Sequence, residues 1–185
     1  RGVIHEEFHS REFSKTGGVF EMVQLWVNLP KKYKMVKPSY QAIVKKDIPK
    51  VSIQNNATLR VVAGKYNNIK GPASTYTEIN IYDISSKDKE NINLNFNRET
   101  NTILLIMRGN LRIGNKSYEE KNILILEREE KILSFQTSKN FKALILNGRP
   151  IDEPIVAHGP FVMNSKQEIL TAIDDYQNGL MEKNI

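Results

Sequence analysis

The alternation of apolar and polar residues in short segments constrains the fold of this chain more than any other feature. In residues 91–97, Ile92, Leu94 and Phe96 occupy every second position, and asparagines fill the positions between them. Side chains along a β-strand point alternately to opposite faces, so this segment predicts a strand with one buried and one solvated face. Similar segments recur through residues 51–147, separated by turn residues at intervals of about 8 to 12 residues. This spacing predicts an all-β sandwich or barrel.

The expected strands share a high content of β-branched and aromatic residues. They cover residues 58–64, 78–82, 91–97, 102–108, 111–113, 122–126, 131–135 and 141–146. Between the fourth and fifth of these segments lies the dipeptide Gly109-Asn110, which favours a two-residue turn. The sequence therefore predicts a tight hairpin at this dipeptide.

The end of the chain changes from strand-like to helical periodicity. A capping-box pattern occurs at Ser165-Lys166-Gln167-Glu168. Apolar residues then recur at helical spacing, namely Ile169, Ala172, Ile173 and Tyr176. Gly179 suits the position just after a last helical turn. These signals predict one helix over residues 165–178.

The N-terminal part of the chain is less regular. Residues 3–8 and 20–29 are rich in β-prone residues, and both are expected to be strands. Residues 14–18 between them end in a pair of glycines and are expected to form a turn. Residues 31–50 lack periodicity and are predicted to link two domains.

Several apolar residues outside the expected barrel also need a place in the fold. Met22, Trp26, Met35 and Met163 are predicted to be packing residues. Residues 153–164 contain prolines that disfavour a regular hairpin, yet they are too apolar to be left in solvent. We therefore expect residues 153–164 to leave the barrel and to contact residues 25–29.

The composition excludes several classes of function. The net charge of +6 comes from lysines scattered among asparagine and isoleucine, and the densest basic stretch, residues 31–37, lacks arginine and interleaved aromatic residues. We expect this stretch to be a solvated loop and the protein to bind no nucleic acid directly. Because the chain has no cysteine, disulfides and thiolate metal ligands are excluded. No apolar run approaches the roughly 20 residues that cross a membrane, so we expect no membrane partner. The lack of cysteine suits a reducing compartment, so we expect a cytoplasmic location.

The sequence His5-Glu6-Glu7 is the candidate chemical site. In a strand, residues i and i+2 point to the same face, so His5 and Glu7 could reach one ion while Glu6 faces away. Imidazole and carboxylate ligands with open positions suit a non-haem Fe(II) site. The alternative is a surface histidine beside a glutamate. His9 and His158 are expected to be surface and turn histidines rather than ligands.

Five segments together resemble the pirin family of the cupin superfamily. They are Arg1-Gly2-Val3-Ile4-His5-Glu6-Glu7, Gln24-Leu25-Trp26-Val27-Asn28-Leu29-Pro30, Lys34-Met35-Val36-Lys37-Pro38-Ser39-Tyr40-Gln41, Gly148-Arg149-Pro150-Ile151-Asp152-Glu153-Pro154-Ile155-Val156 and His158-Gly159-Pro160-Phe161-Val162-Met163-Asn164. They follow the order found in the family and extend over almost the whole chain. The resemblance implies two stacked cupin barrels.

The resemblance also implies how this chain is divided. We expect an all-β chain with a cupin (jelly-roll) β-barrel and a C-terminal α-helix, plus remnant strands of a preceding cupin barrel. Residues 1–40 would be the remnant of the N-terminal barrel with its linker, and residues 51–185 the C-terminal pirin cupin domain with the terminal helix. The missing N-terminal cupin half is expected in the same parent chain or as a separate chain.

Pirins carry one metal ion, usually iron, in the N-terminal barrel. The resemblance implies that its ligands are two histidines from a His-x-His-Arg-Gly-like motif and a His-x-Glu pair. The first motif is absent from this chain, and the second corresponds to His5 and Glu7. We therefore expect an iron site of which this chain supplies half. Residues 51–157 contain no histidine, so the second barrel is expected to be structural and free of metal.

Three functions remain as alternatives. The resemblance implies iron-dependent quercetin 2,3-dioxygenase activity, with a flavonol-like small molecule as substrate and Glu7 as a catalytic base. It also implies a non-enzymatic regulator that binds a transcription factor or a metabolic enzyme. The third alternative is a structural fragment without activity. A His-x-His-Arg-Gly motif upstream of Arg1 would separate the first two alternatives from the third.

Overall fold

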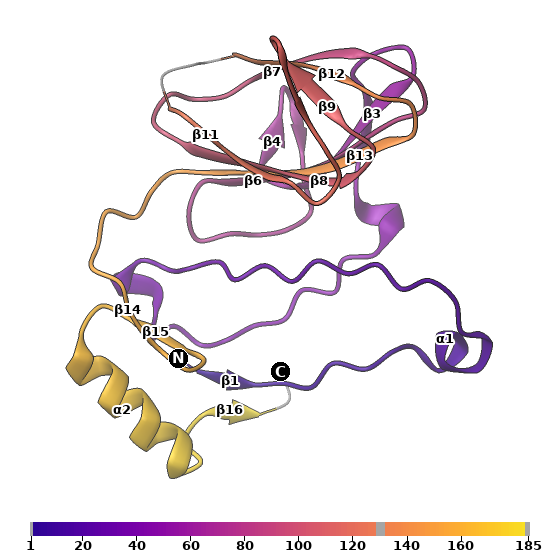
Figure 1. Cartoon of the computed structure of the whole chain (residues 1–185). Coiled ribbons are helices and arrows are strands. Elements are labelled where there is room, and N and C mark those ends of the chain that lie inside the picture. Colours follow the sequence, from indigo (N-terminus) through magenta and orange to yellow (C-terminus); the bar gives the residue numbers. More distant parts are fainter. Residues whose placement is uncertain (1, 129–131, 184–185) are drawn as a thin grey trace. The chain divides into compact units, whose positions relative to one another are not determined.

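The computed structural model describes residues 2–128 and 132–183. Arg1, which begins the first pirin-like segment, and Lys131, which begins an expected strand, lie outside the described residues. The chain divides into two compact units: a barrel unit, Gln41–Pro150, and a terminal unit made of Arg1–Tyr40 and Ile151–Ile185. Figure 1 shows the helices and strands of both units.

The larger sheet of the barrel unit has six strands. In chain order they are β2 (Lys50–Ser52), β3 (Ala57–Ala63), β6 (Ile79–Ser86), β8 (Asn101–Arg108), β11 (Ile123–Leu126) and β13 (Phe141–Gly148). Their order across the sheet is β11-β8-β13-β6-β3-β2, and every neighbouring pair is antiparallel. The long central strands carry the β-branched and leucine-rich segments that the sequence predicted to be strands.

The smaller sheet of the barrel unit has four strands. They are β7 (Asn91–Asn95), β9 (Leu111–Ile113), β10 (Lys116–Tyr118) and β12 (Ile132–Thr137), in the order β10-β9-β12-β7. Beside the two sheets stand the short hairpin of β4 (Lys65–Tyr66) and β5 (Ile69–Lys70) and a single 3-10 turn, η2 (Lys45–Asp47).

The core of the barrel unit lies between the two sheets. Burial alternates along β3, β7 and β13, as the period of two predicted. Side chains from both sheets form one apolar cluster, which includes Leu59, Ile84, Ile92, Leu94, Leu104, Ile106, Phe135, Phe141 and Ile145. The expected all-β architecture is confirmed.

The turn at Gly109-Asn110 does not form the expected hairpin. Gly109 has the positive φ of 75° that a tight turn needs, but β8 pairs with β11 and β13, whereas β9 pairs with β10 and β12. The dipeptide therefore carries the chain from one sheet to the other. The Ser138 hydroxyl accepts a hydrogen bond from the Asn110 N–H at 3.0 Å and so stabilises the segment that connects the two sheets. The hairpin forms one strand later, between β9 and β10.

A buried amide network joins the strands at one end of the six-stranded sheet. Asn147, only 4% exposed, donates through Nδ2 to the hydroxyls of Thr100 and Thr102 at 2.7 and 2.9 Å. Its Oδ1 accepts from Asn80 Nδ2 at 2.9 Å. Buried polar groups stabilise a fold only when they are hydrogen-bonded, and both polar atoms of this amide are.

The terminal unit brings the two ends of the chain together. The strand β1 (Val3–Ile4) pairs in parallel with β16 (Glu182–Lys183). Its other elements are α1 (Arg11–Thr16), η1 (Lys31–Tyr33), the hairpin of β14 (Val156–His158) and β15 (Phe161–Met163), and α2 (Lys166–Gln177). Figure 1 shows β1 and β16 side by side near the two chain ends.

Three expectations for the N-terminal part are wrong in whole or in part. Of residues 3–8, only Val3–Ile4 form a strand, β1. Residues 20–29 form no strand, because a strand requires a hydrogen-bonded neighbour and none of the described residues pairs with this segment. Residues 14–18 are only partly a turn, since residues 14–16 belong to α1. This short helix begins where the Ser10 hydroxyl accepts a hydrogen bond from the Phe13 N–H at 3.1 Å.

The C-terminal helix is confirmed. The Ser165 hydroxyl accepts the Glu168 N–H at 3.2 Å, and the Glu168 carboxylate reaches back to the Asn164 N–H at 3.0 Å. Gly179 follows the last turn with a φ of 70°, a left-handed conformation that glycine adopts without strain. The capping residues therefore set both ends of α2.

Residues 153–164 contact the N-terminal part of the chain through Lys31 and Lys34, but the expectation against a regular hairpin is wrong, because β14 pairs with β15. The backbone N–H of Lys31 donates to the Glu153 carboxylate at 2.7 Å, and Lys34 Nζ donates to the Val162 carbonyl at 3.1 Å. Residues 151–185 accordingly belong to the same compact unit as residues 1–40.

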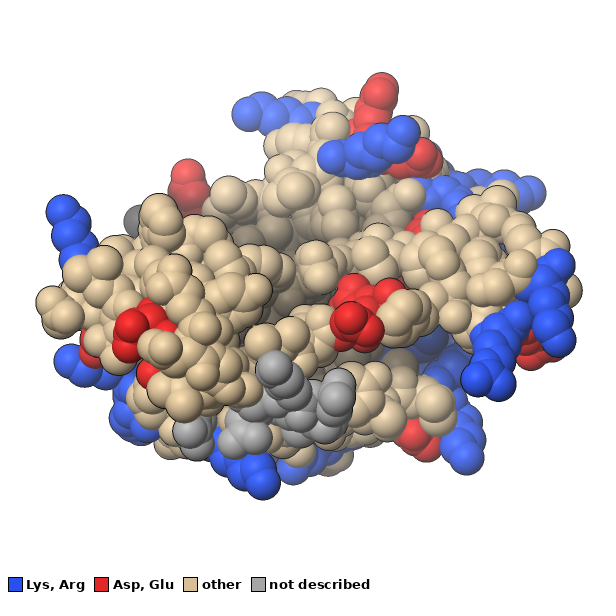
Figure 2. Space-filling view, turned by 90° about the horizontal axis from the view of Figure 1, so that it is seen from below, with Lys and Arg blue, Asp and Glu red and all other residues tan. Residues whose placement is uncertain are grey.

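Charged side chains of both signs are mixed on the face of the described chain that Figure 2 draws. On the face drawn in Figure 2, Lys and Arg form separate groups, and Asp and Glu lie among them. Within the part of the chain that the structure describes, no helix is both long and apolar enough to cross a membrane.

Candidate functional site

The predicted metal ligands lie just after β1. His5 Nδ1 and Glu7 Oε1 are 4.0 Å apart, and the two side chains are 65% and 59% exposed. The strand ends at Ile4, so the pair lies beyond the paired residues. The structure therefore brings an imidazole and a carboxylate to the same side of the chain, where both are accessible to a ligand.

This pair could supply two ligands to one metal ion. Imidazole nitrogen and carboxylate oxygen suit Fe(II) and similar divalent ions. Among residues 2–128 and 132–183, no group of three or more histidine, cysteine, aspartate or glutamate side chains could hold a metal. The donor chemistry thus fits part of a metal site, and the remaining ligands would have to come from water or from outside this chain.

The other two histidines have different surroundings. The His9 ring stacks on Phe13 and meets the edge of Phe20, with ring centroids 5.4 and 4.7 Å apart. His158 is exposed at the end of β14.

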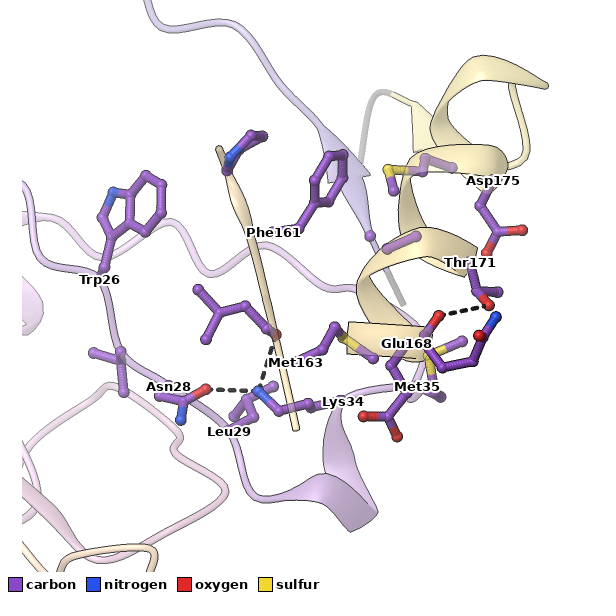
Figure 3. Close-up of a pocket in the computed structure, with 17 residues that line it drawn as sticks. Trp26, Asn28, Leu29, Lys34, Met35, Phe161, Met163, Glu168, Thr171 and Asp175 are labelled. Carbon is purple, nitrogen blue, oxygen red and sulfur yellow. Dashed lines mark hydrogen bonds between the residues drawn. The ribbon is translucent and has the colours of Figure 1, made fainter. Parts of the chain in front are cut away.

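A cavity of about 560 Å³ lies within the terminal unit (Figure 3). It is lined by apolar side chains from residues 26–35 and β15 and by polar side chains of α2. These residues include Trp26, Leu29, Met35, Phe161, Met163, Glu168, Thr171 and Asp175. The cavity therefore combines an aromatic and thioether wall with a wall that carries two carboxylates.

Lys34 is one of the residues that line this cavity. Its Nζ donates to Asn28 Oδ1 at 2.6 Å and to the Val162 carbonyl at 3.1 Å, as Figure 3 shows. Burial lowers the pKa of Lys34, although the charges of Glu153 and Glu168 oppose this shift. The expectation of a solvated lysine loop is wrong for this residue, because its ammonium group joins two distant segments of the chain.

Glu168 links α2 to the N-terminal residues. Its carboxylate accepts hydrogen bonds from the Ser165 hydroxyl at 3.1 Å and the Asn164 N–H at 3.0 Å, and it lies 3.6 Å from Lys31 Nζ. Partial burial raises the pKa of Glu168, but these hydrogen bonds and the lysine charge outweigh it and leave the pKa below its usual value. The ionised carboxylate is thus the form that this site favours.

We expect Glu168→Gln to reduce the pH dependence of local stability in the first turn of α2. A carboxyl group with a lowered folded pKa stabilises fully above its unfolded pKa of about 4.3, and this contribution disappears as the pH falls through the lower folded value. Amide hydrogen exchange in the first turn of α2 should therefore accelerate below about pH 4 in the wild type, after correction for intrinsic rates, and change less in the variant.

Asp174→Asn is the matched control for Glu168→Gln. Asp174 is exposed on the same helix, and its replacement should leave the pH response of the first turn unchanged. An equal response in wild type and Glu168→Gln would contradict the assignment.

The expectation that Met22, Trp26 and Met35 pack in a core is wrong. These side chains are 60%, 68% and 62% exposed, and Trp26 and Met35 line the cavity instead. Met163 is half-buried and also lines it.

The sequence did not indicate that the cavity residues Lys34 and Glu168 belong to one site. The capping box was the available signal for Glu168, since a capping carboxylate is held in a fixed orientation.

The comparison with protein families decides the class of this protein. The model of the pirin C-terminal cupin domain matches residues 81–182, which is more than half of the chain. The chain belongs to the pirin family. The predicted cupin fold with a C-terminal helix is confirmed by this match together with the observed sheets.

Pirin relatives match almost the whole chain. A provisionally named quercetin 2,3-dioxygenase of Pseudomonas aeruginosa is 40% identical over 96% of this chain and 63% of its own length. Pirin-1 of Arabidopsis thaliana is 31% identical over 96% of this chain and 62% of its own length. The crystal structure of a quercetin 2,3-dioxygenase from Acinetobacter baumannii superposes with a TM-score of 0.89 at 41% identity, covering 93% of this chain and 60% of that one. This pirin chain therefore spans less than two thirds of the length of these relatives.

Proposed function

We propose that this chain is part of a pirin-type, metal-dependent dioxygenase that acts on a flavonol such as quercetin. The observation that carries the proposal is the pair of exposed ligand groups, His5 and Glu7, 4.0 Å apart after β1. The names of the Pseudomonas and Acinetobacter relatives support a flavonol as the substrate. Conversion of quercetin is thus the reaction to test first.

In this proposal His5 and Glu7 hold one Fe(II) ion together with ligands from outside residues 1–185 or from water. Bound Fe(II) would supply a centre that binds O2 and the hydroxyl and carbonyl oxygens of the substrate. The Glu7 carboxylate is exposed and can accept a proton from a substrate hydroxyl within hydrogen-bonding reach. The His5 imidazole supplies the nitrogen ligand, and the Glu6 side chain has no part in the site.

The proposal also assigns the parts of the chain. Residues 1–40 are the end of an N-terminal cupin barrel with its linker, and residues 51–185 are the C-terminal cupin domain with its helix. The hydrogen bonds of Lys31 to Glu153 and of Lys34 to Val162 support a C-terminal segment that returns to the first barrel. The metal ligands then belong to one barrel, while the second barrel has a structural role.

The test uses a parent chain extended before Arg1, loaded with Fe(II) without oxygen and then exposed to O2 and quercetin. We expect quercetin to disappear in proportion to bound iron, measured by its absorbance and by metal analysis of the same sample. The control is residues 1–185 alone, which should bind iron weakly and deplete no quercetin, because two protein ligands rarely retain a divalent ion. An iron-loaded parent that leaves quercetin intact would contradict the proposed activity.

A further inference from the structure

The chain contains two Asn-Gly dipeptides, Asn147-Gly148 and Asn178-Gly179. When glycine follows asparagine, the backbone nitrogen of the glycine can attack the side-chain amide of the asparagine, because no Cβ hinders the approach. The two dipeptides share this local chemistry. The structure around each one therefore decides whether the attack takes place in the folded protein.

The first dipeptide lies in β13, a central strand of the six-stranded sheet. Asn147 is 4% exposed, and its Nδ2 donates to the hydroxyls of Thr100 and Thr102. Both residues of the dipeptide are paired with β6 on one side and β8 on the other. To bring the Gly148 nitrogen to the Asn147 amide, the chain would have to break these hydrogen bonds. The reactive conformation at this dipeptide therefore requires the sheet to open.

The second dipeptide follows the last turn of α2. Asn178 is exposed, and a Cβ on Gly179 would meet no atom within 4 Å, so there is open space around the bond to be formed. Asn178 Nδ2 donates to the Asp174 carbonyl at 2.9 Å, and the Gly179 N–H donates to the Tyr176 carbonyl at 3.1 Å. Both hydrogen bonds belong to a helix end, and helix ends fray at little cost in free energy. The reactive conformation is thus readily reached at this dipeptide.

We propose that Asn178 is a site of spontaneous deamidation, which converts it to aspartate and isoaspartate. The Gly179 nitrogen loses its proton and attacks Asn178 Cγ. The new C–N bond closes a succinimide ring, and the Cγ–Nδ2 bond breaks, so that the amide nitrogen leaves as ammonia with the proton given up by Gly179. Water then opens the ring. Hydrolysis at Cγ gives aspartate, and hydrolysis at the backbone carbonyl gives isoaspartate, in which the main chain continues through the side chain.

Either product places a new carboxylate at the end of α2, where it is unfavourable. The C-terminal end of a helix dipole is negative, and Asp174 and Asp175 already lie in the last turns of this helix. The conversion also removes the Nδ2 donor that binds the Asp174 carbonyl. Asp175, before the dipeptide, and Met181, after it, both line the cavity of the terminal unit. Deamidation should therefore destabilise the part of α2 that forms one wall of this cavity.

The test incubates folded residues 1–185 at mildly alkaline pH and follows both dipeptides by peptide mass spectrometry. Replacement of the amide NH2 by OH raises the mass of the peptide, and labelling with an isoaspartyl methyltransferase detects the isoaspartate. We expect conversion at Asn178 to be on the order of 100-fold or more faster than at Asn147, because a helix end opens at almost no cost whereas a central strand opens only with the sheet. In urea that unfolds the chain, the two rates should become similar, since the surroundings of the dipeptides are then equivalent.

Two variants complete the test. Asn178→Gln, whose longer side chain closes a ring far more slowly, should remove the modification and leave Asn147 as it was. Asn178→Asp reproduces one product and should speed amide hydrogen exchange in residues 176–180, while the first turn of α2 stays unchanged. Equally slow conversion of Asn178 and Asn147 in the folded chain would overturn the proposed site. A rate difference that persists in urea would overturn its structural basis, and wild-type exchange in Asn178→Asp would overturn the effect on α2.

Discussion

Replacing His5 with alanine in the extended parent should abolish metal binding. The substitution removes the imidazole that lies 4.0 Å from the Glu7 carboxylate and leaves this chain with one ligand of the proposed pair. Loss of an outer-sphere partner alone typically costs 10- to 100-fold in metal affinity, so loss of a ligand should cost about 100-fold or more. Competition with a chelator of known affinity, followed by metal analysis, measures this change. Quercetin conversion should fall with the bound metal.

Two neighbouring residues serve as matched controls for His5→Ala. Glu6→Ala removes a carboxylate from the residue between the pair and should leave metal affinity nearly unchanged, whereas Glu7→Ala should behave like His5→Ala. His9→Ala removes an imidazole that stacks on Phe13 and meets the edge of Phe20, and it should also leave affinity unchanged. Equal metal loss in the Glu6 and Glu7 variants would contradict the assignment of His5 and Glu7 as the ligand pair.

The barrel was predictable because its signal is local. The alternation in residues 91–97 appears in the structure as β7, with Ile92 and Leu94 buried and the flanking asparagines exposed. The turn at Gly109-Asn110 was predicted at the right position, but it connects the two sheets instead of closing a hairpin. Local turn chemistry does not determine which strands pair afterwards. That choice depends on contacts distant in sequence, such as the hydrogen bond of Ser138 to Asn110.

The terminal unit was harder to predict for the same reason. Residues 20–29 have strand-forming residues but find no pairing partner among the described residues. Trp26 looks like a core residue by composition, yet it lines a cavity whose opposite wall comes from β15 and α2. The His5 and Glu7 pair could be found from spacing because two positions suffice, whereas the Lys34 and Glu168 contacts join segments from opposite ends of the chain.

Gly64→Ala should destabilise the barrel unit by about 3 to 5 kcal/mol, the largest effect on stability that we expect from a single methyl group. Gly64 has a φ of 74°, and a Cβ at this position would overlap Asn80 Oδ1 and the backbone carbonyl oxygen of Ile79. The overlap involves the backbone of β6, which pairs with both β3 and β13 and cannot move alone.

The hydrogen bonds around Gly64 explain why a Cβ at this position should also disturb neighbouring residues. Asn80 Oδ1 accepts the Lys65 N–H at 3.0 Å, and the buried Tyr82 hydroxyl donates to the Lys65 carbonyl at 2.6 Å. Burial, with a smaller contribution from Tyr66, raises the pKa of Tyr82 to about 12, so this hydroxyl keeps its proton at neutral pH. Asn80 also donates to Asn147, and its displacement would therefore disturb the buried amide network.

Gly114→Ala separates the effect of crowding at Gly64 from that of backbone conformation. Gly114 also has a positive φ, 55°, but a Cβ there would meet no atom within 4 Å. Its replacement should cost about 1 kcal/mol, the price of a left-handed conformation for alanine. Urea unfolding followed by the fluorescence of the barrel tyrosines measures both variants. Equal losses would show that φ alone governs these positions, whereas a loss at Gly64 larger by about 2 kcal/mol or more would assign the difference to the contact with Asn80 and Ile79.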